Sequence, residues 1–331
     1  MMFRKILVLL AVGFVLPGWL YALGNSEGRA KPLTIHAISG PSGVGMIRLF
    51  EDPPQIPGFN VKMEAIADGA NLIAGRFLSG EAQIGVLPPQ VAAKIRAQGR
   101  DIQALAIIGN GMLSLLSSDP AVRGIADLRG RTLEMAGQGA TPEFVFRTIL
   151  AANGINPDRD VTMGFSLAYP EIALSLISGN VSTALLPEPF ATMALNGNRN
   201  LRSVIDVQQE WSRAVGGTAG NVSNYPMTLL VADSAFAAAN PVAVKEILNA
   251  VRASSEWVRA NPADAGILVE KHDLGLKAAV VEAAIPRSNY VFIPAAEGRA
   301  SLEALFNVFL KNDPESIGGA LPDDGFYWGS N

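Results

Sequence analysis

The stretch Gly137–Phe144, GQGATPEF, is the first place where residue types and spacing could do chemistry. Its glycines precede apolar residues at helical spacing, so its backbone N–H groups could hold an anion or a polar solute at a helix start. A Walker-type loop needs a Lys that this stretch lacks, and a G-x-G-x-x-G loop needs a glycine where Pro142 stands. Two interpretations remain: a tight turn ahead of a helix, or a solute-binding loop that uses Gly139, Ala140 and Thr141.

A similar turn, Ser39–Ser42, lies earlier in the chain at an offset of 99 residues, which places Gly40 on Gly139 and Leu87-Pro88 on Leu186-Pro187. One offset aligns turns, helix ends and strand ends, which favours two similarly wound lobes. We expect the two turns to face each other across one cleft. The candidate contacts in the earlier turn are Ser39, Gly40, Pro41 and Ser42.

Glu188 follows the strand that ends at Pro187 and is the one candidate that bears on ligand charge. A carboxylate beside an anion is unfavourable where water is excluded, so an inward-facing Glu188 favours a ligand with amine or amidine donors. An outward-facing Glu188 would be a solvated charge without a role. Phe190 could offer a stacking face, although both positions also suit a plain strand end and helix start. The further candidates are Asn71, Pro88, Asn110, Tyr169 and Tyr225.

The composition argues against most catalytic chemistry. The 331 residues include no Cys, and His36 and His272 are the only histidines. Thiolate nucleophiles, disulfides and cysteine-ligated metals are excluded, and a multi-histidine metal site is disfavoured. The net charge of −4 comes without a basic cluster, which argues against a nucleic-acid partner. We therefore expect a protein that is not an enzyme and has no catalytic residues, metal or cofactor.

The elements that must position these residues follow a β-α-β-α pattern, which predicts an α/β fold. We expect a mainly parallel sheet flanked by helices in each lobe, with the strand-to-helix turns on the rim where open α/β sheets bind ligands. In GQGATPEF, Thr141 is the expected N-cap and Pro142 the expected first helical residue.

The lobe boundaries follow from the order of these elements. Residues 112–225 form the predicted second lobe, and the chain then returns, so that the first lobe combines 31–111 with 226–331. Crossings near 110–112 and 224–227 are the arrangement expected of a hinge.

The N-terminus predicts export. Arg4 and Lys5 precede an apolar stretch that Pro17-Gly18 interrupts, and small residues precede a cleavage site after Gly24. An uncleaved membrane anchor is the alternative, and the Pro-Gly break favours cleavage. Without Cys, no lipid-modified N-terminal cysteine is available. We expect residues 1–24 to be a signal peptide and the mature chain to be a soluble periplasmic protein, most simply a monomer.

Two motifs resemble a known family. Asp127–Arg131 (DLRGR) and Asn153–Val161 (NGINPDRDV) are similar to the second-lobe entry of type II periplasmic solute-binding proteins of ABC importers. The nearest group binds nitrate, aliphatic sulfonates, taurine or thiamine precursors. Ser182-Thr183-Ala184 departs from the Asp-Ala that is usual there.

The resemblance implies a two-lobe, Venus-flytrap fold that captures a small-molecule solute between its lobes and delivers it to an ABC permease in the membrane. Because of Glu188, we favour a nitrogenous heterocycle such as a thiamine precursor. A sulfonate, taurine or nitrate binder is the alternative. An enzyme of this fold, such as a pyrimidine synthase, is the alternative of another class, and the lack of Cys argues against it.

Overall fold

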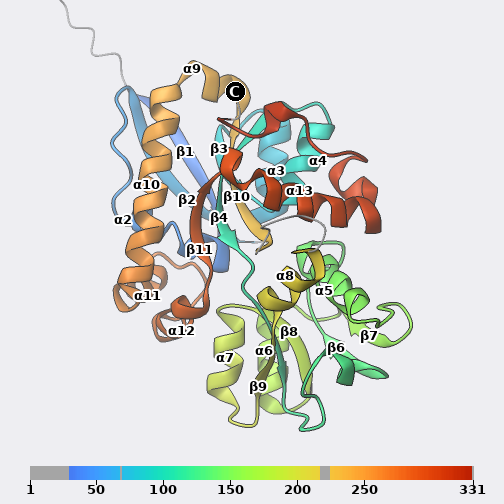
Figure 1. The fold of residues 1–331 in the computed structure, drawn as a ribbon. Coiled ribbons are helices and arrows are strands. Elements are labelled where there is room, and N and C mark those ends of the chain that lie inside the picture. The colour runs from blue at the N-terminus through green and yellow to red at the C-terminus, as the bar shows by residue number, and fades with distance from the viewer. Residues whose placement is uncertain (1–29, 68, 217–223, 330–331) are drawn as a thin grey trace, which may run out of the picture.

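The structure is a computed structural model, and it describes residues 30–67, 69–216 and 224–329. The predicted signal peptide lies outside these ranges. Figure 1 shows two lobes, one above the other, each built on its own sheet with helices around it. The α/β two-lobe fold expected from the sequence is confirmed.

The first sheet, in the upper lobe of Figure 1, has six strands in the order β11-β4-β10-β3-β1-β2. The second sheet, in the lower lobe, has five strands in the order β7-β6-β8-β5-β9. The strands of the first sheet are β1 (Lys31–Ile38), β2 (Phe59–Ile66), β3 (Ile84–Leu87), β4 (Ile102–Asn110), β10 (Pro226–Asp233) and β11 (Tyr290–Pro294). Those of the second are β5 (Leu113–Ser117), β6 (Arg131–Glu134), β7 (Val161–Gly164), β8 (Thr183–Pro187) and β9 (Arg202–Asp206).

Helices cover both sheets, and short 3-10 turns join several of them. The helices of the upper lobe are α1 (Pro41–Val44), α2 (Ile47–Glu51), α3 (Gly69–Ser79), α4 (Pro89–Ala97), α9 (Ser234–Ala239), α10 (Pro241–Ala260), α11 (Pro262–Lys271), α12 (Ala278–Ala284) and α13 (Ala295–Asn312). Those of the lower lobe are α5 (Thr141–Ala152), α6 (Tyr169–Ser178), α7 (Phe190–Gly197) and α8 (Val207–Gly216). The 3-10 turns are η1 (Ile125–Leu128), η2 (Ile285–Arg287), η3 (Pro314–Ile317) and η4 (Asp324–Phe326).

The sheets are mixed, which corrects the expectation of mainly parallel pairing. β1 pairs in parallel with β2 and β3, but β10 inserts antiparallel between β3 and β4. In the second sheet β6 pairs in parallel with β7 and β8, while β5 lies antiparallel between β8 and β9. The inserted strands β10 and β5 begin where the chain enters each lobe, so they run away from the boundary. Their neighbours in the sheets end at the boundary, and the pairing is therefore antiparallel.

This topology points the carboxyl ends of the remaining strands, except β11, at the boundary between the lobes, because β11 runs antiparallel to β4. β4 runs directly into β5, so the end of β4 faces the lower lobe, and β1 and β3 run in the same direction as β4. β8 runs against β5 and therefore ends at the same boundary, together with β6 and β7. The turns after these strands are thus brought to two facing rims.

The repeat at an offset of 99 residues is visible in the backbone. α3 and α6 end at Ser79 and Ser178, and the following Gly80 and Gly179 both have φ 81°. Such a left-handed residue terminates a helix and favours glycine. The two lobes therefore end equivalent helices in the same conformation, 99 residues apart.

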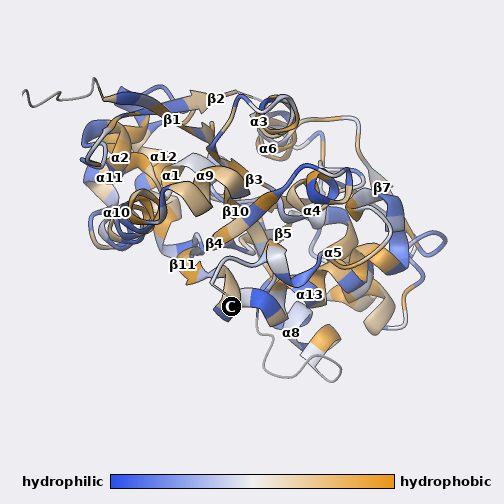
Figure 2. Cartoon of the chain, turned by 90° about the horizontal axis from the view of Figure 1, so that it is seen from above, coloured by the Kyte–Doolittle hydropathy of each residue, from blue (hydrophilic) through white to orange (hydrophobic). Residues whose placement is uncertain are grey.

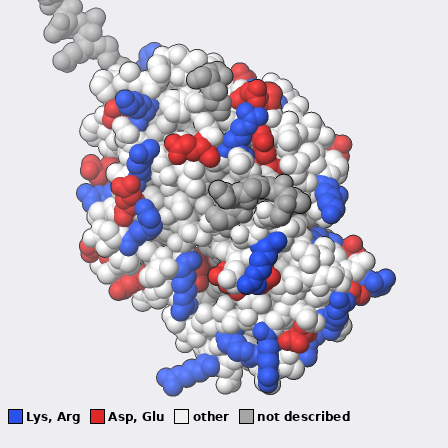
Figure 3. Space-filling model, in the orientation of Figure 1, with Lys and Arg blue, Asp and Glu red and all other residues white. Residues whose placement is uncertain are grey.

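The apolar core extends across the boundary. One cluster of buried side chains joins residues of both lobes, among them Leu133 and Phe144 below and Ile107 and Phe309 above. Seen from above, the strands in the middle of the upper lobe carry mostly hydrophobic residues, and α10 and α11 at the periphery carry many hydrophilic ones (Figure 2). On the face in Figure 3 positive and negative side chains are interspersed over the upper lobe. Within the described ranges no helix is both long and apolar enough for a membrane span.

Candidate functional site

The upper rim of the boundary contains the turn Ser39–Ser42, at the carboxyl end of β1. All four residues are half-buried, and the Ser42 Oγ lies 3.4 Å from the Thr228 Oγ1 on β10. The Gly40 N–H donates to the carbonyl of Leu274 at 3.0 Å. Gly40 has φ 89°, so a glycine suits this turn. Pro88, after β3, is half-buried and caps α4.

Asn110 lies where β4 leaves the upper lobe. Its exposed fraction is 4%, and its backbone N–H donates to the carbonyl of Asn289 at 3.0 Å. Its Oδ1 is buried and has no hydrogen-bond partner among the described residues. A buried amide oxygen without a partner is energetically costly.

The lower rim contains GQGATPEF, and its local structure differs from the prediction. The N-cap of α5 is Ala140 and Thr141 is the first helical residue. The buried Glu143 carboxylate caps the turn instead, because the Gly139 N–H donates to its Oε2 at 2.7 Å. Arg147 donates to its Oε1 at 2.7 Å. The Gly139 N–H that was expected to meet the solute is therefore already satisfied by a carboxylate of the same helix.

Thr141 contacts the other lobe rather than open space. Its hydroxyl donates to Oε1 of Gln90 on α4 at 3.3 Å, and both residues are buried. The partner across the boundary is therefore α4, whereas the sequence suggested the turn Ser39–Ser42. Ala140 beside it is half-buried.

Asn71 and Gly139 line one cavity beside the contact of Thr141 with Gln90. Both are exposed, and both line this cavity of about 450 Å³ together with Gln90. Polar residues such as Lys94 and Asp313 and apolar residues such as Leu78 complete its wall. The structure thus brings one predicted residue from each lobe into one cavity.

Glu188 is buried, with an exposed fraction of 1%, so the outward-facing, solvated alternative is wrong. Its Oε2 accepts the backbone N–H of Thr192 at 3.0 Å, while its Oε1 is buried and unpartnered within the described part of the chain. Burial raises the pKa of Glu188 above its usual value, and the bonds from Thr192 and the charge of Arg287 oppose that rise. Arg287 reaches over from the upper lobe, with Nη1 3.4 Å from the Thr192 Oγ1.

The aromatic candidates contact protein. Tyr169 and Phe190 begin α6 and α7 and stack on each other, with ring centroids 6.0 Å apart and an interplanar angle of 18°. The Tyr169 hydroxyl donates to the carbonyl of Ala136 at 3.2 Å, and burial raises the pKa of Tyr169 well above its usual value. Tyr225 is fully buried and lies edge-on against Trp211 at 5.5 Å, where the chain returns to the upper lobe.

Sequence reasoning missed four polar residues of this boundary: Gln90, Thr192, Thr228 and Arg287. Gln90 had a signal, since it follows Pro88-Pro89 at the start of a helix on the predicted rim. The others depend on which helix or strand packs opposite, and no local pattern shows that.

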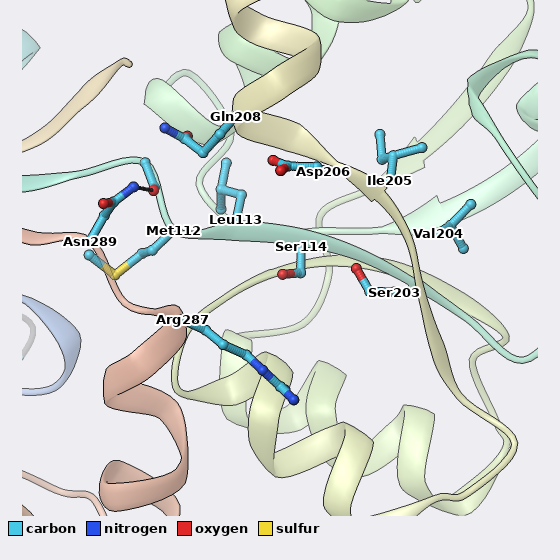
Figure 4. A pocket seen from close by; sticks show the side chains of 11 residues that line it. Met112, Leu113, Ser114, Ser203, Val204, Ile205, Asp206, Gln208, Arg287 and Asn289 are labelled. Carbon is cyan, nitrogen blue, oxygen red and sulfur yellow. Dashed lines mark hydrogen bonds between the residues drawn. The ribbon is translucent and has the colours of Figure 1, made fainter. Parts of the chain in front are cut away.

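A second cavity, of about 420 Å³, lies beside the chain crossing at Gly111 (Figure 4). Gly111 and Ser114, on the crossing into β5, share it with Asp206 and Gln208 of the lower lobe and with Arg287 of the upper. The edge strand β9 of the second sheet and the turn η2 border this cavity. Arg287 thus lines this cavity and also lies beside Thr192 at the boundary. No group of three or more His, Asp or Glu side chains in the described ranges is arranged to hold a metal ion.

Residues 89–270 match the NMT1-like family. The nitrate/nitrite binding protein NrtA of Synechococcus elongatus is 26% identical over 178 residues, which are 52% of this chain and 36% of that protein's own length. The match thus spans only about a third of this relative.

Two solved structures share the fold. An ABC transporter structure from Parabacteroides distasonis superposes with a TM-score of 0.74 at 22% identity, covering 90% of this chain and 98% of the other. The periplasmic aliphatic sulphonate binding protein SsuA of Escherichia coli superposes with a TM-score of 0.69 at 16% identity, covering 90% and 92%. The resemblance indicated by the sequence motifs is confirmed, and the match over more than half of its length shows that this chain belongs to the NMT1-like family.

Proposed function

We propose that the protein is the extracytoplasmic solute-binding component of an ABC importer. It would capture one small solute between its lobes and deliver it to a membrane permease. Family membership and the fold shared with an ABC transporter structure support this role. The relatives named as nitrate/nitrite and sulphonate binding proteins bind small solutes, and this chain has the same two-lobe architecture.

The mechanism in this proposal is closure about the two chain crossings. Residues 112–225 would move as one lobe against 31–111 and 226–331, with hinges near 110–112 and 224–227. A solute that touches both rims stabilises the closed form more than the open form, and that difference shifts the population. An exported monomer, cleaved after Gly24, is part of the same proposal.

The proposed solute carries nitrogen-bound donors. The observation behind this choice is the Oε1 of Glu188, a carboxylate oxygen that is buried at the boundary without a partner. An N–H donor or a cationic nitrogen would satisfy it, and a nitrate or sulfonate oxygen would repel it while it is ionised. Asn110 offers a second unpartnered acceptor. A nitrogenous heterocycle such as a thiamine precursor fits these acceptors.

The proposed contacts divide between the two rims. From the upper lobe we propose Asn71, Pro88, Asn110 and the turn of Ser39, Gly40, Pro41 and Ser42, and from the lower lobe Gly139, Ala140, Thr141, Tyr169, Glu188 and Phe190, with Tyr225 at the hinge. Thr141 and Gly139 would have to exchange their present partners, Gln90 and Glu143, to serve the solute. Glu188 and Asn110 need no such exchange, and they therefore carry most of the proposal.

Two alternatives remain in competition. A nitrate or sulfonate binder is suggested by the names of the relatives. In that case a neutral, protonated Glu188 could donate to the anion, since burial raises its pKa. An enzyme of this fold would need chemistry that the chain, with no Cys and two separated His, does not offer.

The experiment is to purify the mature protein without unfolding it and to identify co-purifying small molecules by mass spectrometry. Each one found is then tested by thermal shift and calorimetry on wild type, Glu188→Gln and the control Glu246→Gln, which changes an exposed carboxylate on α10. We expect a nitrogenous organic molecule, with affinity reduced at least about tenfold in Glu188→Gln and unchanged in the control. A sulfonate or nitrate bound equally well by all three proteins would contradict the proposed class, and conversion of the molecule would favour the enzyme.

A further inference from the structure

One face of α5 lies against the upper lobe along much of its length. Thr141 and Phe144 are three residues apart and therefore share a face of the helix. Thr141 meets Gln90 on α4, and the ring of Phe144 meets the ring of Phe309 on α13. A helix of the lower lobe is thus held by two helices of the upper one.

The aromatic contact has the geometry of a buried pair. The centroids of Phe144 and Phe309 are 5.1 Å apart at an interplanar angle of 88°, an edge-to-face arrangement. Their exposed fractions are 6% and 0%. Both rings belong to the hydrophobic cluster that continues from one lobe into the other.

The same seam continues down α5. Thr148 and Ala151 are further along this face and line a groove opposite Ala304 and Val308 of α13. The groove has a volume of about 600 Å³. The helices α5 and α13 are therefore in close contact at Phe144 and Phe309 and border a groove further along, at Thr148 and Ala151.

Opening the lobes costs free energy where α5 contacts α4 and α13. α5 begins at the rim of the lower lobe and α13 packs on β4 of the upper, so a hinge rotation that separates the rims separates Phe144 from Phe309. Two buried rings would then meet water, and the buried pair of Thr141 and Gln90 would lose its hydrogen bond.

We propose that the contact of Phe144 with Phe309 is a clasp that keeps the two lobes together in the absence of solute. The α5 turn then stays docked on α4, and solute enters through brief openings. Affinity for solute is set in part by the strength of the clasp, because a closed form that is already populated needs less binding energy. This consequence for affinity rests on the proposed function, whereas the clasp itself does not.

The lack of cysteine makes a distance measurement direct. Leu72 on α3 and Leu174 on α6 are 51% and 59% exposed, one in each lobe. The double variant Leu72→Cys, Leu174→Cys provides two unique positions for spin labels. Pulsed electron–electron double resonance (DEER) then measures the distance between the lobes in the solute-free protein.

Phe144→Leu is the test variant and Phe146→Leu its matched control. Phe146 is equally buried in the same helix but points about 200° away, because each helical residue turns by about 100°. We expect one short, narrow distance distribution in the wild type and in the control. In Phe144→Leu the share of molecules with separated lobes should rise roughly tenfold.

The partner side gives an independent pair. Phe309→Leu is expected to reproduce the shift, and its control Phe306→Leu, which removes a ring that packs on Phe326 within the upper lobe, is not. If Phe144→Leu proves too unstable to label, Phe309→Leu decides. A wild type that is mainly open without solute, or distributions that do not respond to either variant, would overturn the clasp. The protein is dialysed free of co-purified solute before it is labelled, so failure to find a transported solute leaves this test intact.

Discussion

At the scale of single residues, Glu188 determines how the boundary responds to pH. Burial raises the pKa of its carboxyl in the folded protein above the value in the unfolded chain. The folded state then holds the proton more tightly. The associated stability is present in full below the unfolded pKa and is lost as pH rises through the folded pKa.

The variant Glu188→Gln lacks this carboxyl group, so its stability does not contain the pH-dependent contribution of Glu188. Relative to wild type it should gain stability as pH rises from 4 to 8, by about 1.4 kcal/mol for each unit by which the pKa is raised. Urea unfolding at several pH values measures this difference. Glu246→Gln should track wild type throughout, and a constant gap between wild type and Glu188→Gln would show that the pKa is not raised.

The sequence showed the candidate residues better than it showed their partners. Glycines and prolines located the turns at both rims, because only a few residue types suit those backbone positions. It could not show that Glu143 rather than a solute accepts from Gly139, or that Tyr169 stacks on Phe190. Those contacts depend on side-chain reach and on the angle between two helices, which spacing does not encode.

At the scale of elements, the helix ends were predictable and three strands were not. Gly80 and Gly179, which the offset of 99 residues aligns, follow the ends of α3 and α6. β5, β9 and β11 were missed. β9 and β11 are partly exposed edge strands, and β5 is a short run whose role comes from pairing with β8 and β9. Such pairing depends on residues far apart in the sequence, so the local alternation of apolar and polar residues does not predict it.

The paired helix ends give an element-scale prediction. At Gly179, with φ 81° and free space around an added Cβ, Ala would cost about 1 kcal/mol through backbone strain alone. Gly75, inside α3 and equally free of neighbours, has no such strain, and Gly75→Ala should instead stabilise the protein by about 0.5–1 kcal/mol. Chemical unfolding of the two variants should therefore show opposite signs. A gain in Gly179→Ala would contradict the capping role.

At the scale of the whole molecule, the crossing at Gly111 limits how the lobes can be joined. A Cβ at this position would overlap the ring of Tyr225 and the Oε1 of Gln208. We expect Gly111→Ala to destabilise the protein by about 2 kcal/mol, since the neighbours are a buried ring and a buried amide. Urea unfolding measures the loss. Gly124→Ala, where an added Cβ meets no atom within 4 Å, should be nearly neutral, and equal losses in both variants would refute this steric account.

The position of β10 has a consequence for the order in which the protein forms. This strand lies between β3 and β4, yet it follows the whole lower sheet in the sequence. While the chain is being made, the lower sheet is complete in residues 113–206 when the upper one still lacks a central strand. β3 and β4 cannot complete their hydrogen bonding until residues 226–233 arrive. We therefore expect the lobe that begins first in the sequence to be the last to finish folding.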